Sequence, residues 1–243
     1  MTARPPVNLK IPYCKPLNLT LGLQYGIFQF MNKNKSILKV SFVALFAAII
    51  CIGCFIAIPI GPIPIVLQNM FAVLTGVLLG SYLGGAPTAL WLVAGLIGLP
   101  VYSGGRGGVA VWAGPTGGFL PGYLIGAVIA GFIAGRPSIT QKKITWKIAL
   151  RVTLAMFAGM IILYLPGVIH FAHWAEKAGK IPADKTAFAF TMGACVLPYI
   201  PGDLLKILVA VPVALKVRPV LAQYLYNEKK AAPAADEHSD ENK

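Results

Sequence analysis

Residues 37–58, ILKVSFVALFAAIICIGCFIAI, form an apolar run in which Lys39 is the single charged residue. A helix needs about 20 mostly apolar residues to cross the hydrocarbon core of a bilayer, so this run is predicted to span a membrane. Further apolar runs follow along the chain, in which 57% of residues are hydrophobic and 12% are charged. The chain is therefore predicted to be an all-α integral membrane protein.

Six membrane-spanning helices are predicted, with one short apolar helix before the last of them. The spans are placed at residues 37–58, 64–83, 85–99, 115–135, 146–169 and 202–218, and the short helix at residues 186–198. A glycine-rich loop at 100–114 follows the third span, and Pro198 and Pro201 interrupt the chain before the sixth. Irregular backbone at membrane depth must be buried in protein or line a cavity, so a pocket is expected between these two broken regions on the outer face.

The basic residues predict how the chain is oriented. They form clusters before the first span, between the fourth and fifth, and after the last, at Lys33, Lys35, Lys39, Arg136, Lys142, Lys143, Lys147, Lys216 and Arg218. With six crossings all three clusters fall on one side, which the positive-inside rule makes cytoplasmic together with both termini. The net charge of +13 thus reflects topology. A nucleic-acid-binding function would need a basic soluble domain, and no stretch of this chain is predicted to form one.

The two ends of the chain are predicted to lie outside the membrane domain. Residues 1–36 are assigned to an N-terminal extension, 37–220 to the six-helix domain and 221–243 to a disordered tail. Residues 1–30 are rich in proline and lack the apolar core of a signal peptide. Met31 begins a short basic leader, so it is expected to be the initiator, or else residues 1–30 are disordered and unnecessary.

An acid and a base stand out in the last span, within the stretch Tyr199-Ile200-Pro201-Gly202-Asp203-Leu204-Leu205-Lys206. Charge at membrane depth is costly, so Asp203 and Lys206 are candidates for a functional site. The alternative is a mutually neutralising pair that only stabilises the start of the helix. Arg106 in the glycine-rich loop could meet a ligand carboxylate, or it could be a solvated loop residue.

Four short strings, in this order and spacing, carry a resemblance to a known family. They are IPIGPIPIVLQ at 58–68, GLIGLPVYSGG at 95–105, GPTGGF at 114–119 and PGDLLK at 201–206. Together they resemble the BioY family, the biotin-specific substrate-binding (S) components of energy-coupling-factor (ECF) transporters. The resemblance covers about residues 36–220. Phe119, where the family commonly has tyrosine, and Pro121 depart from the family pattern.

The resemblance implies a six-helix protein of the cell membrane that captures biotin from outside and imports it. It makes Asp203 and Lys206 ligand contacts; their chemistry suits the ureido group, and Arg106 could suit the carboxylate. Its further lining candidates are Gln68, Thr116, Gly117, Gly118 and Tyr123. Biotin is the ligand, and no cofactor or metal is expected.

The resemblance also implies partner proteins. Ala44 and Ala48 lie one helical turn apart in the first span, where small residues allow close approach of another helix. The family resemblance makes them the contact with a transmembrane coupling subunit. The sequence has no GxxxxGK[ST] string, so energy is expected to come from two partner ATPase subunits.

Three other functions remain as alternatives: an ECF subunit for another vitamin, a self-sufficient biotin permease, and a membrane-embedded enzyme using Asp203 with a histidine. The enzyme alternative is disfavoured, because the sequence contains no nucleophile elbow, HExxH string or acidic metal cluster. Cys51 and Cys54 form a CxxC string inside an apolar run, which favours packing over redox chemistry. His170 and His173 are interpreted as interfacial residues.

Overall fold

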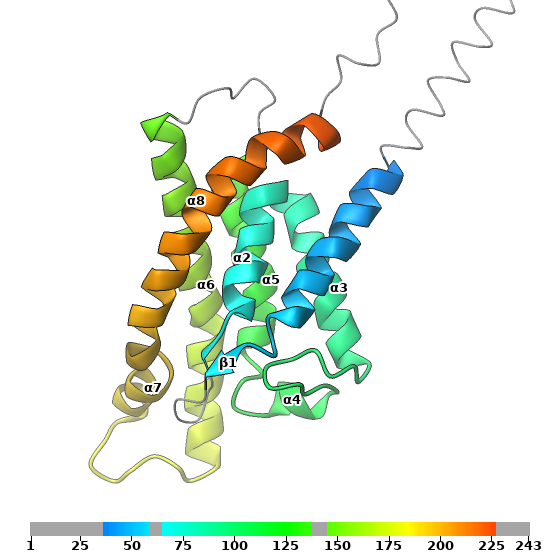
Figure 1. The fold of residues 1–243 in the computed structure, drawn as a ribbon. Coiled ribbons are helices and arrows are strands. Elements are labelled where there is room, and N and C mark those ends of the chain that lie inside the picture. The colour runs from blue at the N-terminus through cyan, green and yellow to red at the C-terminus, as the bar shows by residue number, and fades with distance from the viewer. Residues whose placement is uncertain (1–35, 59–64, 138–144, 227–243) are drawn as a thin grey trace, which may run out of the picture. The chain divides into compact units, whose positions relative to one another are not determined.

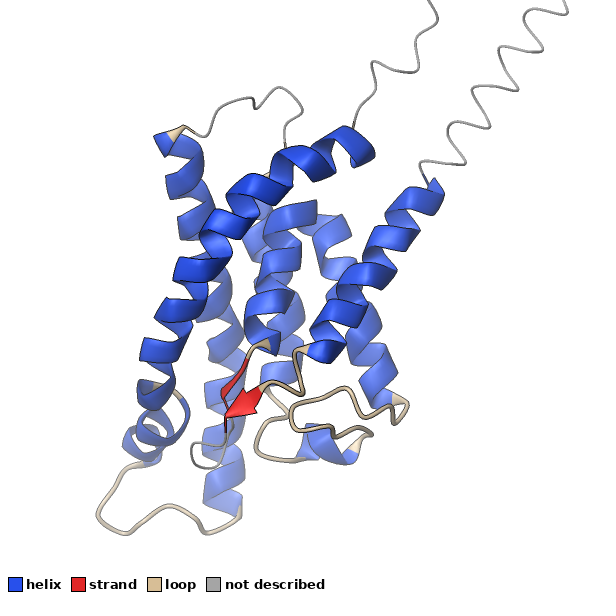
Figure 2. Cartoon of the chain, in the orientation of Figure 1, coloured by secondary structure: helices blue, strands red, loops and turns tan. Residues whose placement is uncertain are grey.

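The computed structural model describes residues 36–58, 65–137 and 145–226, most of which are helical (Figures 1 and 2). The first helix is Ser36–Ile52, and a two-stranded antiparallel ribbon of β1 (Ala57–Ile58) and β2 (Ile65–Val66) follows it. The remaining helices are α2 (Gln68–Leu79), α3 (Ser81–Leu96), α4 (Ala110–Ala113), α5 (Phe119–Ala134), α6 (Trp146–Lys177), α7 (Ala187–Cys195), a 3-10 turn (Leu197–Tyr199) and α8 (Ile200–Leu225). The predicted all-α class is confirmed.

Each predicted span falls on a helix, but several ends move. The first helix stops at Ile52 instead of residue 58, and α2 starts at Gln68 instead of 64, because the intervening backbone pairs as β1 and β2. Helix α6 runs past residue 169 to Lys177, and Gly179 follows it with φ 59°, a left-handed conformation that commonly ends helices. Helix α8 continues to Leu225, so the boundary drawn at residue 220 lies inside it. Residues 1–35 and 227–243, with the expected start at Met31, lie outside the described residues.

Among the described helices, Trp146–Lys177 alone combines the length and mean hydropathy needed to cross a membrane. The helices Ser36–Ile52, Gln68–Leu79 and Phe119–Ala134 are apolar but shorter.

Helix α2 is the centre of the packing. All of its residues except Phe71 are buried, and it contacts α3, α5, α6 and α8. Gly76 makes the closest of these approaches possible, because a Cβ on it would lie 1.9 Å from the carbonyl oxygen of Ala127 on α5. Helices α2 and α5 thus touch backbone to backbone, as small residues allow in membrane proteins.

Gly76→Ala should lower the thermal unfolding temperature of the purified protein, because the added methyl group forces α2 and α5 apart. Overpacking of this kind costs about 1–3 kcal/mol. Gly193→Ala in α7 is the matched control, since a Cβ there meets nothing within 4 Å. Equal unfolding temperatures for the two variants in detergent would contradict this account of the α2–α5 contact.

The glycine-rich loop is held in place by buried aromatic side chains. Trp91 Nε1 donates to the carbonyl oxygen of Val101 at 2.8 Å, and the Tyr102 hydroxyl donates to that of Leu92 at 2.6 Å. Gly95 leaves the space that the Tyr102 ring fills, because a Cβ there would lie 2.2 Å from the ring. The segment around residues 101–103 is therefore held in one position by these contacts. It is called the 101–103 wall below, and it lies at the same end of the fold as α7 (Figure 1).

Arg218 lies in a different environment from the other described members of the predicted basic clusters. Lys39, Arg136, Lys147 and Lys216 are exposed, whereas the Arg218 side chain is buried. Its guanidinium donates to the carbonyl oxygen of Val77 at the end of α2, and to those of Ala134 and Gly135 at the end of α5, at 2.9 and 3.0 Å. Arg218 therefore joins the ends of α2 and α5 to α8, a role that its place in a basic cluster did not predict.

Candidate functional site

A pocket opens between α2, α5, α6, α8 and the 101–103 wall. Its apolar lining comes from Val66, Val111, Phe119, Leu120 and Leu163. Its remaining lining residues are Gln68, Asn69, Tyr102, Ser103, Thr116, Tyr123, Tyr164, Cys195, Tyr199 and Lys206. A mostly apolar cavity with a few convergent polar groups is the usual form of a small-molecule site.

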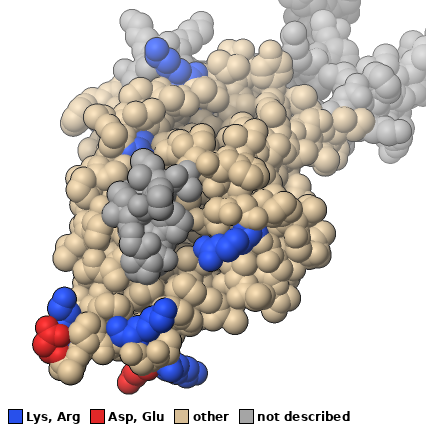
Figure 3. Space-filling model, turned by 60° about the horizontal axis from the view of Figure 1, so that its bottom comes forward, with Lys and Arg blue, Asp and Glu red and all other residues tan. Residues whose placement is uncertain are grey.

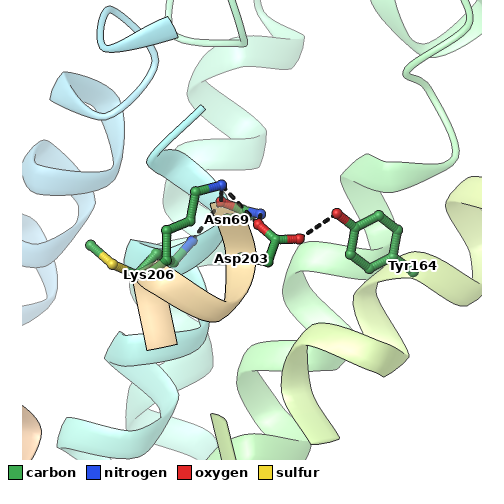
Figure 4. A network of polar contacts seen from close by, with 5 residues as sticks. Asn69, Tyr164, Asp203 and Lys206 are labelled. Atoms are coloured by element: carbon green, nitrogen blue, oxygen red, sulfur yellow. Dashed lines mark hydrogen bonds and ion pairs between the residues drawn. The ribbon is translucent and has the colours of Figure 1, made fainter. Parts of the chain in front are cut away.

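The strongest polar feature is a network built on the Asp203 carboxylate (Figure 4). Its Oδ1 accepts from Asn69 Nδ2 at 3.1 Å and from Lys206 Nζ at 2.9 Å. Its Oδ2 accepts from the Tyr164 hydroxyl at 2.5 Å. Lys206 Nζ also donates to Asn69 Oδ1 at 3.0 Å. The network therefore joins α2, α6 and α8 at one point.

The local sequence explains where the two charges lie. Pro201 occupies the start of α8, and Asp203 follows in the first turn, where the helix dipole favours an acid. Lys206 lies three residues on and shares its face, so the two form an ion pair. Both side chains are buried. A buried ion pair persists only when further hydrogen bonds satisfy it, and Asn69 and Tyr164 supply them here.

The network leaves Lys206 with donor capacity toward the pocket. An ammonium group has three N–H donors, and Asn69 and Asp203 accept two of them. Lys206 lines the pocket, and its ion-pair partner Asp203 lies 2.9 Å from it. Lys206 can therefore donate a hydrogen bond to a ligand oxygen, while Asp203 balances its positive charge.

Three of the other residues predicted from the sequence also line the pocket. Thr116 and Tyr123 contribute from the start of α5 and the residues before it. Gln68 lines the pocket too, but its amide donates to the carbonyl oxygens of Ile50 at 3.2 Å and Val101 at 2.7 Å. Gln68 therefore also ties the 101–103 wall to the first helix.

The other three predicted residues lie outside the lining. The Arg106 side chain is exposed, and its Nε donates to the carbonyl oxygen of Ser103 in its own loop at 3.1 Å. Gly117 and Gly118 allow close packing: a Cβ would lie 1.8 Å from the Trp112 carbonyl oxygen and 2.2 Å from His170 Cβ, respectively.

Five polar lining residues were not predicted from the sequence: Asn69, Tyr102, Ser103, Tyr164 and Tyr199. Asn69 could have been predicted from the sequence, because it directly follows Gln68 and forms with it a polar pair within a predicted apolar span. Ser103 has a buried hydroxyl without a hydrogen-bond partner among the described residues. A tyrosine in an apolar helix usually packs against its neighbours, so the sequence did not single out Tyr164 as a pocket residue.

The remaining candidates for metal or redox chemistry do not converge. No group of three or more His, Cys, Asp or Glu side chains within residues 36–58, 65–137 and 145–226 could hold a metal ion. His170 Nε2 is hydrogen-bonded to the carbonyl oxygen of Gly114 at 2.9 Å.

Charged side chains are sparse on the face of the molecule shown in Figure 3, most of which is uncharged.

Comparisons with known proteins identify the family to which this chain is similar. Residues 31–223 match the model of the BioY family. The biotin transporter BioY of Rhodobacter capsulatus is 38% identical over 76% of this chain and 94% of its own length. The biotin transporter BioY of Thermotoga maritima is 33% identical over 72% of this chain and 92% of its own.

A solved structure shows the same fold. It is the crystal structure of the S-component for biotin from an ECF-type ABC transporter, with a TM-score of 0.56 and 30% sequence identity. The match covers 76% of this chain and 93% of that one.

Proposed function

This chain belongs to the BioY family, and from that premise we propose that it is the membrane subunit that binds biotin on the outer side and serves its uptake. The observation that carries the proposal is the buried network of Asn69, Asp203 and Lys206 at an otherwise largely apolar pocket. The family is one of transporters, so the chain is a transport subunit and not an enzyme.

The chemistry of the pocket suits the three parts of biotin. The ureido ring offers two N–H donors and a carbonyl oxygen, which match the acceptors and the cation of the Asp203–Lys206 network. The apolar thiophane ring fits the walls made by side chains such as Phe119, Leu120 and Leu163. A buried polar network of this kind gives strong discrimination, because a ligand lacking the matching groups leaves it unpaired.

The carboxylate of biotin lies toward the outer loop in this proposal. Ser103 and Thr116 present hydroxyl groups in the lining there, and Arg106 extends from the same loop. For Arg106 to meet the carboxylate, its side chain must exchange its bond to the Ser103 carbonyl oxygen for one to the ligand. Gln68 and Tyr123 border the ligand, while Gly117 and Gly118 shape the pocket by letting α5 pack closely.

The proposal includes partners and topology. Biotin uptake is driven by an ECF transmembrane coupling subunit and two ATPase subunits. Ala44 and Ala48 form the contact with the coupling subunit, since both are exposed on the first helix while Ala47 and Ile50 face inward. Six crossings leave both termini in the cytoplasm, with residues 1–30 as a dispensable N-terminal extension.

Titration of the purified chain in detergent with biotin tests the function. Saturable binding is expected, with biotin recovered chemically unchanged and with no competition from riboflavin or thiamine. Preferential binding of another vitamin, or no binding of biotin, would contradict the proposal. Biotin uptake by proteoliposomes that contain this chain without ATPase subunits would instead favour the self-sufficient permease.

A further inference from the structure

Arginines gather where α2 and α5 end, away from the pocket at the start of these helices. The Arg218 guanidinium donates to the carbonyl oxygen of Gly135 at 3.0 Å. The Arg151 guanidinium covers the same residue, because a Cβ on Gly135 would lie 3.0 Å from its Nη2, and its Nε donates to the carbonyl oxygen of Ile133 at 2.6 Å. Arg136 directly follows Gly135 in the chain. Three arginines, from α6, α8 and the residues after α5, therefore meet at one turn of backbone.

The described residues balance these three positive charges only in part. The C-terminal ends of α2 and α5 each carry roughly −0.5 of an elementary charge, which leaves about two positive charges unbalanced. The described acids are three, and all of them lie elsewhere in the fold: Glu176, Asp184 and Asp203. The sequence of residues 138–144, between α5 and α6, adds two lysines and no acid. The cluster therefore attracts an anion that the described residues do not supply.

The place of Arg151 on α6 favours a phospholipid as the source of that anion. Helix α6 begins at Trp146, which is 77% exposed, and exposed tryptophans are typical of the membrane–water interface. Arg151 lies further along the helix, about 7.5 Å deeper at about 1.5 Å per residue. The exposed side chains of Leu150 and Leu154 flank it. At that depth an exposed arginine meets lipid phosphates beside acyl chains.

Arg151 also has donors for a phosphate. Its two terminal nitrogens carry four N–H groups, and no described residue accepts from them. A guanidinium binds a phosphate through two parallel hydrogen bonds. The buried Arg218 lies close enough to Arg151 to repel it, so a bound anion relieves that repulsion. Arg136 is exposed and can add a further donor.

We propose that Arg136, Arg151 and Arg218 bind the phosphate of an anionic phospholipid, on the membrane face that the proposed topology assigns to the cytoplasm. Basic sites between helices on that face are typical binding sites of anionic headgroups. None of the three arginines lines the pocket, so this site is separate from the proposed biotin site.

Thermal unfolding of the detergent-purified full-length protein tests the site. The probes are dioleoylphosphatidylglycerol, dioleoylphosphatidylcholine and inorganic phosphate, each titrated separately. Phosphatidylglycerol should raise the unfolding temperature of wild type saturably. Its half-saturating concentration should be at least about tenfold below that of phosphatidylcholine, the factor that about 1.4 kcal/mol represents. Inorganic phosphate at the same concentrations should have no effect.

The double variant Arg136→Gln/Arg151→Gln should raise the half-saturating concentration of phosphatidylglycerol at least about tenfold. The matched control is Lys177→Gln/Lys180→Gln, which removes two exposed cations at the other end of α6 and should behave like wild type. Equal losses in both double variants would indicate general charge attraction, and an unchanged arginine variant would place the lipid elsewhere. Either result overturns the site.

Three results without any substitution also overturn it. Equal stabilisation by the two lipids would exclude an anion site, and equal stabilisation by inorganic phosphate and phosphatidylglycerol would make a free anion the ligand. If phosphatidylglycerol stabilises the chain only after residues 231–243 are deleted, this segment of four acids and one lysine occupies the cluster instead. Failure of wild type to bind biotin would reject the proposed function and leave the lipid site unaffected.

Discussion

Asp203→Asn and Lys206→Ala should each weaken biotin binding more than tenfold in protein that still inserts and folds. Each change removes a charge-assisted hydrogen bond of about 1.5–3 kcal/mol, and about 1.4 kcal/mol corresponds to tenfold. Each also leaves the opposite charge of a buried ion pair without its partner. The measurement is titration of the detergent-purified variants with biotin.

Two matched controls separate the site from a general effect of charge. Lys216→Ala removes an exposed lysine from the same helix, and Asp184→Asn removes an exposed acid before α7. Both should bind biotin like wild type. If Asp203→Asn and Lys206→Ala bind biotin unchanged, the pair only stabilises the start of α8 and the ligand site lies elsewhere.

The sequence predicted this pair because a charge in an apolar helix is visible without knowing the fold. The partners of the pair were not visible, since they come from other helices: Asn69 from α2 and Tyr164 from α6. Which face of each helix turns toward α8 depends on close backbone contacts such as that of Gly76 with α5, and no local pattern encodes them.

The same limit applies to the glycine-rich loop. Its composition predicted irregular backbone at a pocket, and Ser103 does line one. The direction of a single long side chain in that loop is not encoded in composition, so the sequence left Arg106 open between a ligand contact and a solvated loop residue, and in the structure its Nε donates to its own loop. The span ends moved for a related reason, because β1 and β2 pair with each other and interrupt apolar runs that read as helix.

Ala44→Trp or Ala48→Trp should abolish most biotin uptake while leaving biotin binding intact. Both alanines are exposed on the first helix, and neither lines the pocket. Small residues let two helices approach closely, so an indole ring there holds a partner helix away. Uptake is measured in cells that depend on imported biotin, and binding is measured with the purified variants.

Leu45→Trp is the control for added bulk. Leu45 is also exposed, but with 3.6 residues per turn it points about 100° away from Ala44 and about 60° away from Ala48. Normal uptake by Leu45→Trp beside failed uptake by both alanine variants would place the coupling contact on one narrow face. If all three variants import biotin normally, the partner binds another surface. If both alanine variants lose biotin binding as well as uptake, the first helix supports the pocket, where Gln68 already bonds to Ile50, and is not an independent docking face.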